Sequence, residues 1–189
     1  MAQPQTPPDR VTPAWRPGDT RPDVAAMLRV DQAGEYGATR IYAGQLAVLG
    51  DRHKSSALIA GMAAQEKEHL RYFDDLLAER GVRPTILQPF WAAAGHALGA
   101  ATALMSPAAA MACTAAVEDE IDAHYSSQLA ALGDSDPPLS ASIEKFQADE
   151  RGHRAAAIEA GAETSFGYPL LYGAIRIGCR AAIELSKRI

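Results

Sequence analysis

Two short stretches of the sequence carry the same pair of residue types that bind metal ions. Glu66 precedes His69 by three residues, and Glu150 precedes His153 by the same interval. On a helix this spacing places the two side chains on one face, one turn apart. Each pair could therefore hold a metal ion between a carboxylate and an imidazole.

Each pair also has a single glutamate upstream at nearly the same distance. Glu35 lies 31 residues before Glu66, and Glu118 lies 32 residues before Glu150. The chain therefore contains, twice, a lone glutamate on one helix and a Glu-x-x-His pair on the next. Four carboxylates and two imidazoles from four helices are the ligand set of di-iron and di-manganese centres in ferritin-like bundles. The alternative is that these residues lie on the solvated faces of amphipathic helices.

The rest of the sequence favours a fold built from helices alone. A chain of 189 residues can form one substantial core but not two, and no segment alternates in the manner of a half-buried strand. We expect an all-α protein, a ferritin-like four-helix bundle with additional apolar and amphipathic helices, as a single domain over residues 22–189. Residues 1–21 contain five prolines among polar residues, which predicts a disordered tail.

Charge and cysteine content exclude several other classes of protein. The net charge of −5 argues against a nucleic-acid binder, which needs a concentrated basic surface. Cys113 and Cys179 lie in separate segments without Cys-x-x-Cys spacing, which disfavours a disulfide scaffold or a zinc ribbon and suits a reducing compartment. The first twenty residues lack the apolar core of a signal peptide, so we expect a cytosolic protein.

Local start and stop signals divide the chain into six expected helices. Ser106 followed by Pro107 is typical of a helix start, and Gly81 of a helix end. The expected helices are 22–50, 53–80, 89–104, 106–133, 139–161 and 168–189.

The segment that follows Glu118 carries both a candidate site residue and a run of charge. Tyr125 shares the face of Glu118, two turns further along the helix. Asp119, Glu120 and Asp122 are typical of a solvated face, although Asp122 could orient a ligating histidine from outside the metal site.

For two segments the sequence does not decide between packing in the protein core and contact with a membrane. Residues 90–117 carry no formal charge, which satisfies the length criterion for a membrane span, but Pro107 divides the run and alanine and glycine dominate it. We expect a short apolar helix at its start that is either core or lies against a bilayer or a lipid-binding partner. The last helix carries Arg176 and Arg180 among apolar residues. It either covers the core with its arginines solvated, or binds anionic lipid through them.

Three passages closely resemble the demethoxyubiquinone hydroxylase family: LRVDQAGEYGA at 28–38, AMACTAAVE at 110–118 and GCRAAI at 178–183. The resemblance extends over residues 22–189. It implies a ferritin-like bundle with membrane-associating helices that hydroxylates a demethoxyquinone ring late in ubiquinone synthesis. Matched by position, it implies a transfer of electrons or protons by His124 and Tyr125. It also implies two iron ions bound by Glu35, Glu66, His69, Glu118, Glu150 and His153.

The same resemblance implies further partners. They are a polyprenyl quinone substrate, O₂, a reduced nicotinamide (NADH or NADPH) as electron source, a quinone-pathway lipid carrier protein, and a homo-oligomer bound peripherally to the cytoplasmic face of the cell membrane. No glycine fingerprint of a nicotinamide site occurs in the sequence. Glu184 stands where some relatives have a tyrosine, which weakens any mechanism that needs that tyrosine.

Because ferritin-like bundles host several activities, the ligands alone do not choose a reaction. The leading hypothesis is a di-iron monooxygenase that acts on a lipid quinone. The alternatives are a ferritin-like iron-handling or peroxidase protein, and a lipid-binding scaffold with a vestigial site.

Overall fold

Helices make up all the regular secondary structure in the computed structural model, which describes residues 23–51 and 53–189. The tail expected at residues 1–21 lies outside these ranges. The predicted all-α, ferritin-like fold is confirmed. In chain order the elements are α1 (Val24–Leu49), α2 (Ser56–Arg80), α3 (Gln88–Met105), α4 (Pro107–Leu132), α5 (Pro137–Glu159), a short 3-10 helix η1 (Ala162–Thr164) and α6 (Tyr168–Ser186).

The observed helix ends lie close to the predicted ones because local hydrogen bonds determine them. The Ser106 hydroxyl accepts a hydrogen bond from the backbone N–H of Ala109 at 3.0 Å, which caps α4 as expected. The Asp136 carboxylate caps α5 in the same way by accepting from Leu139 at 3.2 Å. As a result α5 begins at Pro137, two residues before the expected start.

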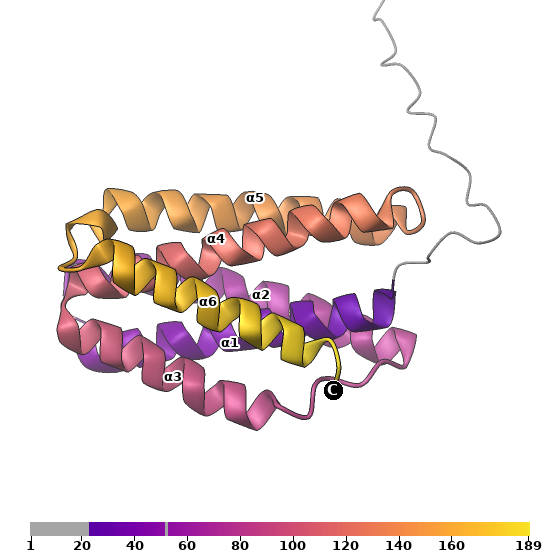
Figure 1. Ribbon diagram of the computed structural model, residues 1–189, viewed down its shortest axis with the longest axis horizontal. Helices are drawn as coiled ribbons and strands as arrows, with labels where there is room; N and C mark the ends of the chain where they lie inside the picture. The colour runs from indigo at the N-terminus through magenta and orange to yellow at the C-terminus, as the bar shows by residue number, and fades with distance from the viewer. Residues whose placement is uncertain (1–22, 52) are drawn as a thin grey trace, which may run out of the picture.

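Four long helices, α1, α2, α4 and α5, form the bundle, and the two others cover one side of it. Helix α3 packs on α1 and α4, whereas α6 packs on α4 and α1. Figure 1 shows α6 crossing in front of the bundle and α3 running along its lower edge. The side formed by α2 and α5 has no covering helix among the described residues.

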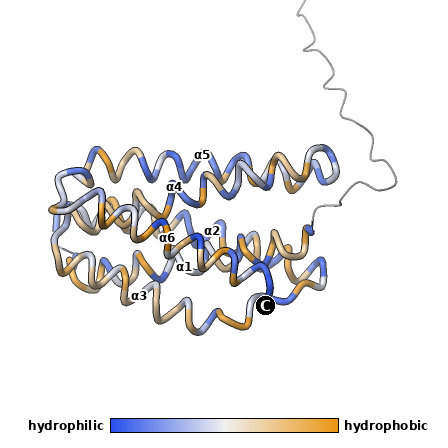
Figure 2. The backbone as a smooth tube through the Cα atoms, viewed as in Figure 1, coloured by the Kyte–Doolittle hydropathy of each residue, from blue (hydrophilic) through white to orange (hydrophobic). Residues whose placement is uncertain are grey.

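Glycines allow α3 to approach α1 at backbone distance. A Cβ on Gly99 would lie 2.0 Å from the carbonyl oxygen of Ile41, and a Cβ on Gly44 would lie 2.1 Å from that of His96. Close packing on α1 therefore accounts for the buried side of the uncharged run. Figure 2 shows that α3 is mostly hydrophobic or neutral along its length. In the part of the chain that the structure describes, no helix has both the length and the apolarity needed to cross a membrane.

The buried apolar side chains form clusters on both sides of a polar layer. One cluster contains Tyr42, Ile59 and Met111, and another contains Leu28, Phe73, Tyr125, Ile143 and Phe146. All six predicted metal ligands lie between these two clusters along their helices. Rigid apolar packing above and below therefore holds the polar side chains in place.

Candidate metal centre

The structure brings together all six residues that the sequence predicts as metal ligands. They come from α1, α2, α4 and α5, and each is at most 4% exposed. Within each of two sets of four residues, one ligand atom per residue lies within 4.8 Å of the others. The two sets share Glu66 and Glu150. One set adds Glu35 and His69, and the other adds Glu118 and His153.

Most donor atoms of this cluster have no hydrogen-bond partner within the described part of the chain. Eight buried atoms that face the cluster make no hydrogen bond there, although a buried polar group without a partner is costly. Two cations would satisfy all of them, so the residues fit a two-metal site. The atoms are Oε2 of Glu35 and Glu118, both carboxylate oxygens of Glu66 and Glu150, and Nδ1 of His69 and His153.

The electrostatics of the cluster also favour cations. Burial, followed by the charge of Glu150, raises the pKa of Glu66 and of Glu118 well above the usual value. Burial disfavours the charged form of His69, but its contacts with Glu150 and Glu35 outweigh this effect and raise its pKa to about 10. Without metal, protons therefore neutralise part of the cluster, and a metal ion would displace them.

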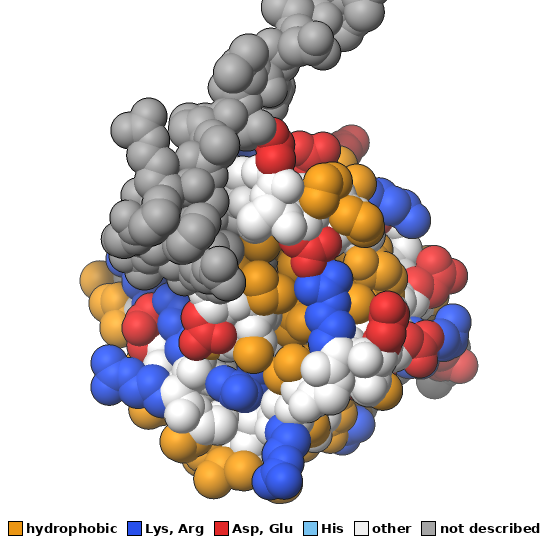
Figure 3. All heavy atoms as spheres, turned by 90° about the vertical axis from the view of Figure 1, so that its right-hand side faces the viewer, with side chains coloured by type: hydrophobic (Ala, Val, Ile, Leu, Met, Phe, Trp, Pro, Cys, Tyr) orange, Lys and Arg blue, Asp and Glu red, His pale blue; other side chains and the backbone are white. Residues whose placement is uncertain are grey.

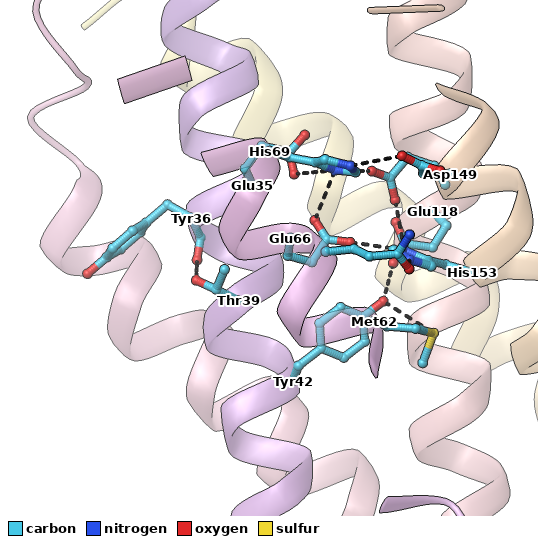
Figure 4. A network of polar contacts seen from close by, with 12 residues as sticks. Glu35, Tyr36, Thr39, Tyr42, Met62, Glu66, His69, Glu118, Asp149 and His153 are labelled. Carbon is cyan, nitrogen blue, oxygen red and sulfur yellow. Dashed lines mark hydrogen bonds and ion pairs between the residues drawn. The ribbon is translucent and has the colours of Figure 1, made fainter. Parts of the chain in front are cut away.

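Two buried tyrosines hold the two terminal glutamates. The Tyr125 hydroxyl donates a hydrogen bond to Glu35. The Tyr42 hydroxyl donates one to Glu118 at 2.5 Å (Figure 4). Burial is the main reason why the pKa of both phenols is raised well above 10. Sequence reasoning found Tyr125 but missed Tyr42. The available signal was spacing, because each tyrosine follows a lone glutamate by seven residues.

His124, the other residue predicted by resemblance, lies outside the cluster. Its Nε2 is 3.3 Å from the buried carboxylate of Asp31, which also accepts a hydrogen bond from Gln128 at 2.7 Å. The ring of His124 is 6.4 Å from that of Tyr125, measured between centroids. His124 therefore belongs to neither set of candidate metal ligands.

The outer nitrogen of each histidine in the cluster has its own partner. His69 Nε2 is 3.2 Å from a carboxylate oxygen of Asp149, and His153 Nε2 is 2.9 Å from the amide oxygen of Gln65. These contacts direct Nδ1 of both rings toward the cluster. The suggestion that Asp122 orients a histidine is wrong, because Asp122 binds Arg151 at 2.8 Å instead.

The charge run on α4 fixes α6 to the bundle. Glu120 is only 4% exposed and accepts hydrogen bonds from Arg176 and from Arg180, the latter at 2.8 and 2.9 Å. Asp119 lies 2.8 Å from Arg176 and 3.2 Å from Arg154. The arginines of the last helix are thus paired with carboxylates, an arrangement that neither of the two sequence-based alternatives included.

Two hollows lie between different helices of the structure, one lined by α1, α3, α4 and α6 and one by α2 and α5. A cavity of about 450 Å³ lies between α1, α3, α4 and α6, and among the described residues Glu120 is the one charged residue that lines it. Its wall includes Gly34 and Val117, which directly precede Glu35 and Glu118 in sequence. A second hollow of about 390 Å³ lies between α2 and α5. Its lining is more polar and includes Gln65, Asp149 and His153.

A four-helix bundle that gathers four glutamates and two histidines in its interior defines the class of ferritin-like carboxylate proteins. Within that class the chain belongs to the family described as ubiquinone biosynthesis protein COQ7, whose family model matches residues 22–186.

Characterised relatives are similar over nearly the whole chain. The 3-demethoxyubiquinol 3-hydroxylase of Rhodospirillum rubrum is 50% identical over 175 residues, which cover 92% of this chain and 82% of that protein. The mitochondrial NADPH-dependent 3-demethoxyubiquinone 3-hydroxylase of Homo sapiens is 46% identical, over 90% of this chain and 80% of its own length. The mitochondrial 5-demethoxyubiquinone hydroxylase of Saccharomyces cerevisiae is 40% identical, over 86% and 77%.

Proposed function

We propose that this protein is an O₂-dependent monooxygenase that hydroxylates the ring of a polyprenyl demethoxybenzoquinol, the 3-demethoxyubiquinol 3-hydroxylase step of ubiquinone biosynthesis. Membership of the family and the names of its characterised relatives support this assignment. The observation that carries it is the apolar cavity whose lining includes Gly34 and Val117, the residues next to Glu35 and Glu118 of the donor cluster. We also propose that residues 22–189 form one domain.

Two iron ions are the metals that this ligand set suits best, because carboxylate and imidazole donors dominate it and no thiolate is near. Glu66 and Glu150, which belong to both sets of donors, would help to hold both ions. Glu35 and His69 would complete one position, and Glu118 and His153 the other. When bound and reduced, the iron pair supplies O₂ activation, so that one oxygen atom enters the ring carbon–hydrogen bond and the other leaves as water, with two electrons and two protons from a reductant.

The protein's own residues would place the ring and keep water away from it. The cavity is lined by small and aliphatic side chains, which suit a prenylated ring better than a polar metabolite. Gly34 and Gly37 leave open space where a Cβ would stand, so the cavity can extend close to α1. Substrate bound there would lie beside the helix segments that carry Glu35 and Glu118.

Tyr42 and Tyr125 would keep the terminal glutamates in position as neutral hydrogen-bond donors, because burial strongly disfavours ionisation of both phenols. We propose that His124, whose Nε2 lies 3.3 Å from the carboxylate of Asp31, passes protons or electrons toward the cluster. NADH or NADPH is the proposed source of electrons, in line with the NADPH dependence stated for the mammalian relatives.

The helices that cover the cavity also expose large apolar side chains. Phe90, Leu104 and Met105 of α3 and Leu170 and Ile177 of α6 are 60–81% exposed. Figure 3 shows one end of the bundle, where hydrophobic side chains gather at the lower edge, the height of α3 in Figure 1. We propose that this side rests on the cytoplasmic face of the cell membrane and admits the lipid substrate. A lipid carrier protein or a second copy of the chain would bind the same exposed side chains.

An isotope experiment tests the assignment. Iron-loaded protein is incubated with a short-tailed demethoxyquinol, a chemical reductant and ¹⁸O₂, and the quinone products are analysed by mass spectrometry. The expected product is heavier by one labelled oxygen atom. Iron oxidation without a labelled product would instead support the iron-handling or peroxidase alternative.

A further inference from the structure

The two halves of the bundle repeat the same supporting residues at the same intervals. Taking the lone glutamate of each half as reference, a tyrosine follows after seven residues and a glutamine after ten. Each of these side chains supports the other half: Tyr42 bonds Glu118 and Tyr125 bonds Glu35. The glutamines behave alike, because Gln45 donates to Thr114 at 3.3 Å and Gln128 to Asp31 at 2.7 Å, four residues before Glu118 and Glu35 respectively.

The halves differ where the glutamines bind, at Thr114 in one and Asp31 in the other, and they differ again behind the histidines. Gln65 and Asp149 occupy matched positions, since each directly precedes a glutamate that belongs to both sets of donors, and both line the hollow between α2 and α5. Each contacts the outer nitrogen of the opposite half's histidine, but one offers an amide oxygen and the other a carboxylate. Figure 4 shows the Asp149 carboxylate directed at the ring of His69 from the side away from the cluster.

This difference acts on the metal positions through the imidazole rings. Nδ1 of His69 lies 3.2 Å from Glu150, and Nδ1 of His153 lies 3.0 Å from Glu66, so both rings present the same nitrogen to the cluster. A carboxylate that accepts the N–H on the far side makes the imidazole a stronger donor to metal than a neutral amide does. It also adds one negative charge near one position only.

We propose that the two metal positions are unequal, and that the position of Glu35 and His69 binds its ion more tightly and fills first because Asp149 stands behind His69. Asp149 is thus a positioning residue, and Gln65 is its weaker counterpart at the other position. The inference rests on the proposed metal site, and it concerns binding rather than turnover.

The test uses full-length metal-free protein titrated with Co²⁺ and followed by calorimetry and by visible absorption. Two variants isolate the positions: His153→Ala keeps the position of His69, and His69→Ala keeps the position of His153. The first variant is expected to bind Co²⁺ more tightly than the second. Adding Asp149→Asn should weaken binding about 10–100-fold in the His153→Ala protein and leave the His69→Ala protein unchanged.

Reciprocal and control substitutions separate this effect from general loss of structure. Gln65→Glu should tighten binding in the His69→Ala protein only. Asp122→Asn removes a carboxylate that binds Arg151 rather than a histidine, and should change neither affinity. Equal affinity of the two single-position proteins, or an equal effect of Asp149→Asn on both, would overturn the inequality. Failure of the unmodified protein to bind Co²⁺ would overturn the metal site itself and with it this inference.

Discussion

The side of the bundle formed by α1 and α4 differs from the side formed by α2 and α5, although the same metal cluster lies between them. On the first side α3 and α6 enclose an apolar cavity with a single charged lining residue, Glu120. On the second side no helix of residues 23–51 and 53–189 covers the hollow, and the polar residues Gln65, Asp149 and His153 line it. The four-helix bundle thus supplies the donor cluster, and the two added helices supply the environment suited to a lipid.

The largest effect on hydroxylation should come from a variant that removes one predicted metal ligand, Glu118, which lines neither hollow. Glu118→Ala takes one donor from the cluster and leaves both hollows unfilled. Loss of an outer partner of a metal ligand costs about 10–100-fold, so loss of a ligand should reduce hydroxylation by more than that. Metal content and product formation should fall together. A variant that still hydroxylates at full rate would show that Glu118 is no ligand.

Filling the cavity with a larger side chain should lower the rate of hydroxylation without changing the metal content. Gly178 of α6 lines the cavity, whereas Gly173 on the same helix does not, and a Cβ on either meets no atom within 4 Å. Gly178→Leu should lower the hydroxylation rate on the order of 10-fold by occupying substrate space. Metal content should remain unchanged. Gly173→Leu is the matched control, and equal activity of the two variants would show that substrate does not enter this cavity.

Replacing a glycine by alanine should lower the free energy of unfolding on the covered side and raise it on the open side. Gly99→Ala places a Cβ 2.0 Å from a carbonyl oxygen of α1, so the helices must move apart at a cost of about 1–3 kcal/mol. Gly61→Ala lies in α2 at the open side with no atom near its new Cβ, and should stabilise the helix by about 0.5–1 kcal/mol. Chemical denaturation measures both changes. A stabilised Gly99→Ala protein would contradict the close contact of α3 with α1.

The ion pairs between Glu120 and the arginines of α6 should make a smaller, pH-dependent contribution to the stability of the protein. Burial raises the pKa of Glu120, but hydrogen bonds from Arg180 and Arg176 outweigh this effect and lower it below 4.5. The carboxylate of Glu120 therefore binds a proton less tightly in the folded state than in the unfolded chain. The pairing stabilises the protein above about pH 4.5, and its contribution disappears as the pH falls through the lowered pKa.

Glu120→Gln isolates that contribution. At neutral pH the variant should lose about 1 kcal/mol of the free energy of unfolding, because water still reaches both arginine side chains, of which Arg176 is 29% and Arg180 61% exposed. The difference between the unmodified protein and the variant should shrink as the pH is lowered below 4.5. Urea unfolding at several pH values measures it, and a difference independent of pH would contradict the assigned pairing.

The sequence alone predicted the elements whose signals are local. Three-residue spacing of glutamate and histidine on a helix identified Glu66, His69, Glu150 and His153, and the interval to the preceding helix identified the two lone glutamates. Caps such as Ser106 determined where helices begin. The chain also contained a signal that was overlooked, the seven-residue interval from Glu35 to Tyr42.

The tertiary structure decided everything that depends on contacts between distant segments. The partners of Glu120 lie 56 and 60 residues away, and the carboxylate behind His69 lies 80 residues away, so no spacing rule finds them. The cavity likewise exists only because glycines in α3 fit against α1 while α6 is held on α4 by ion pairs. Helix periodicity fixes which residues share a face, but the packing of one helix against another decides what that face meets.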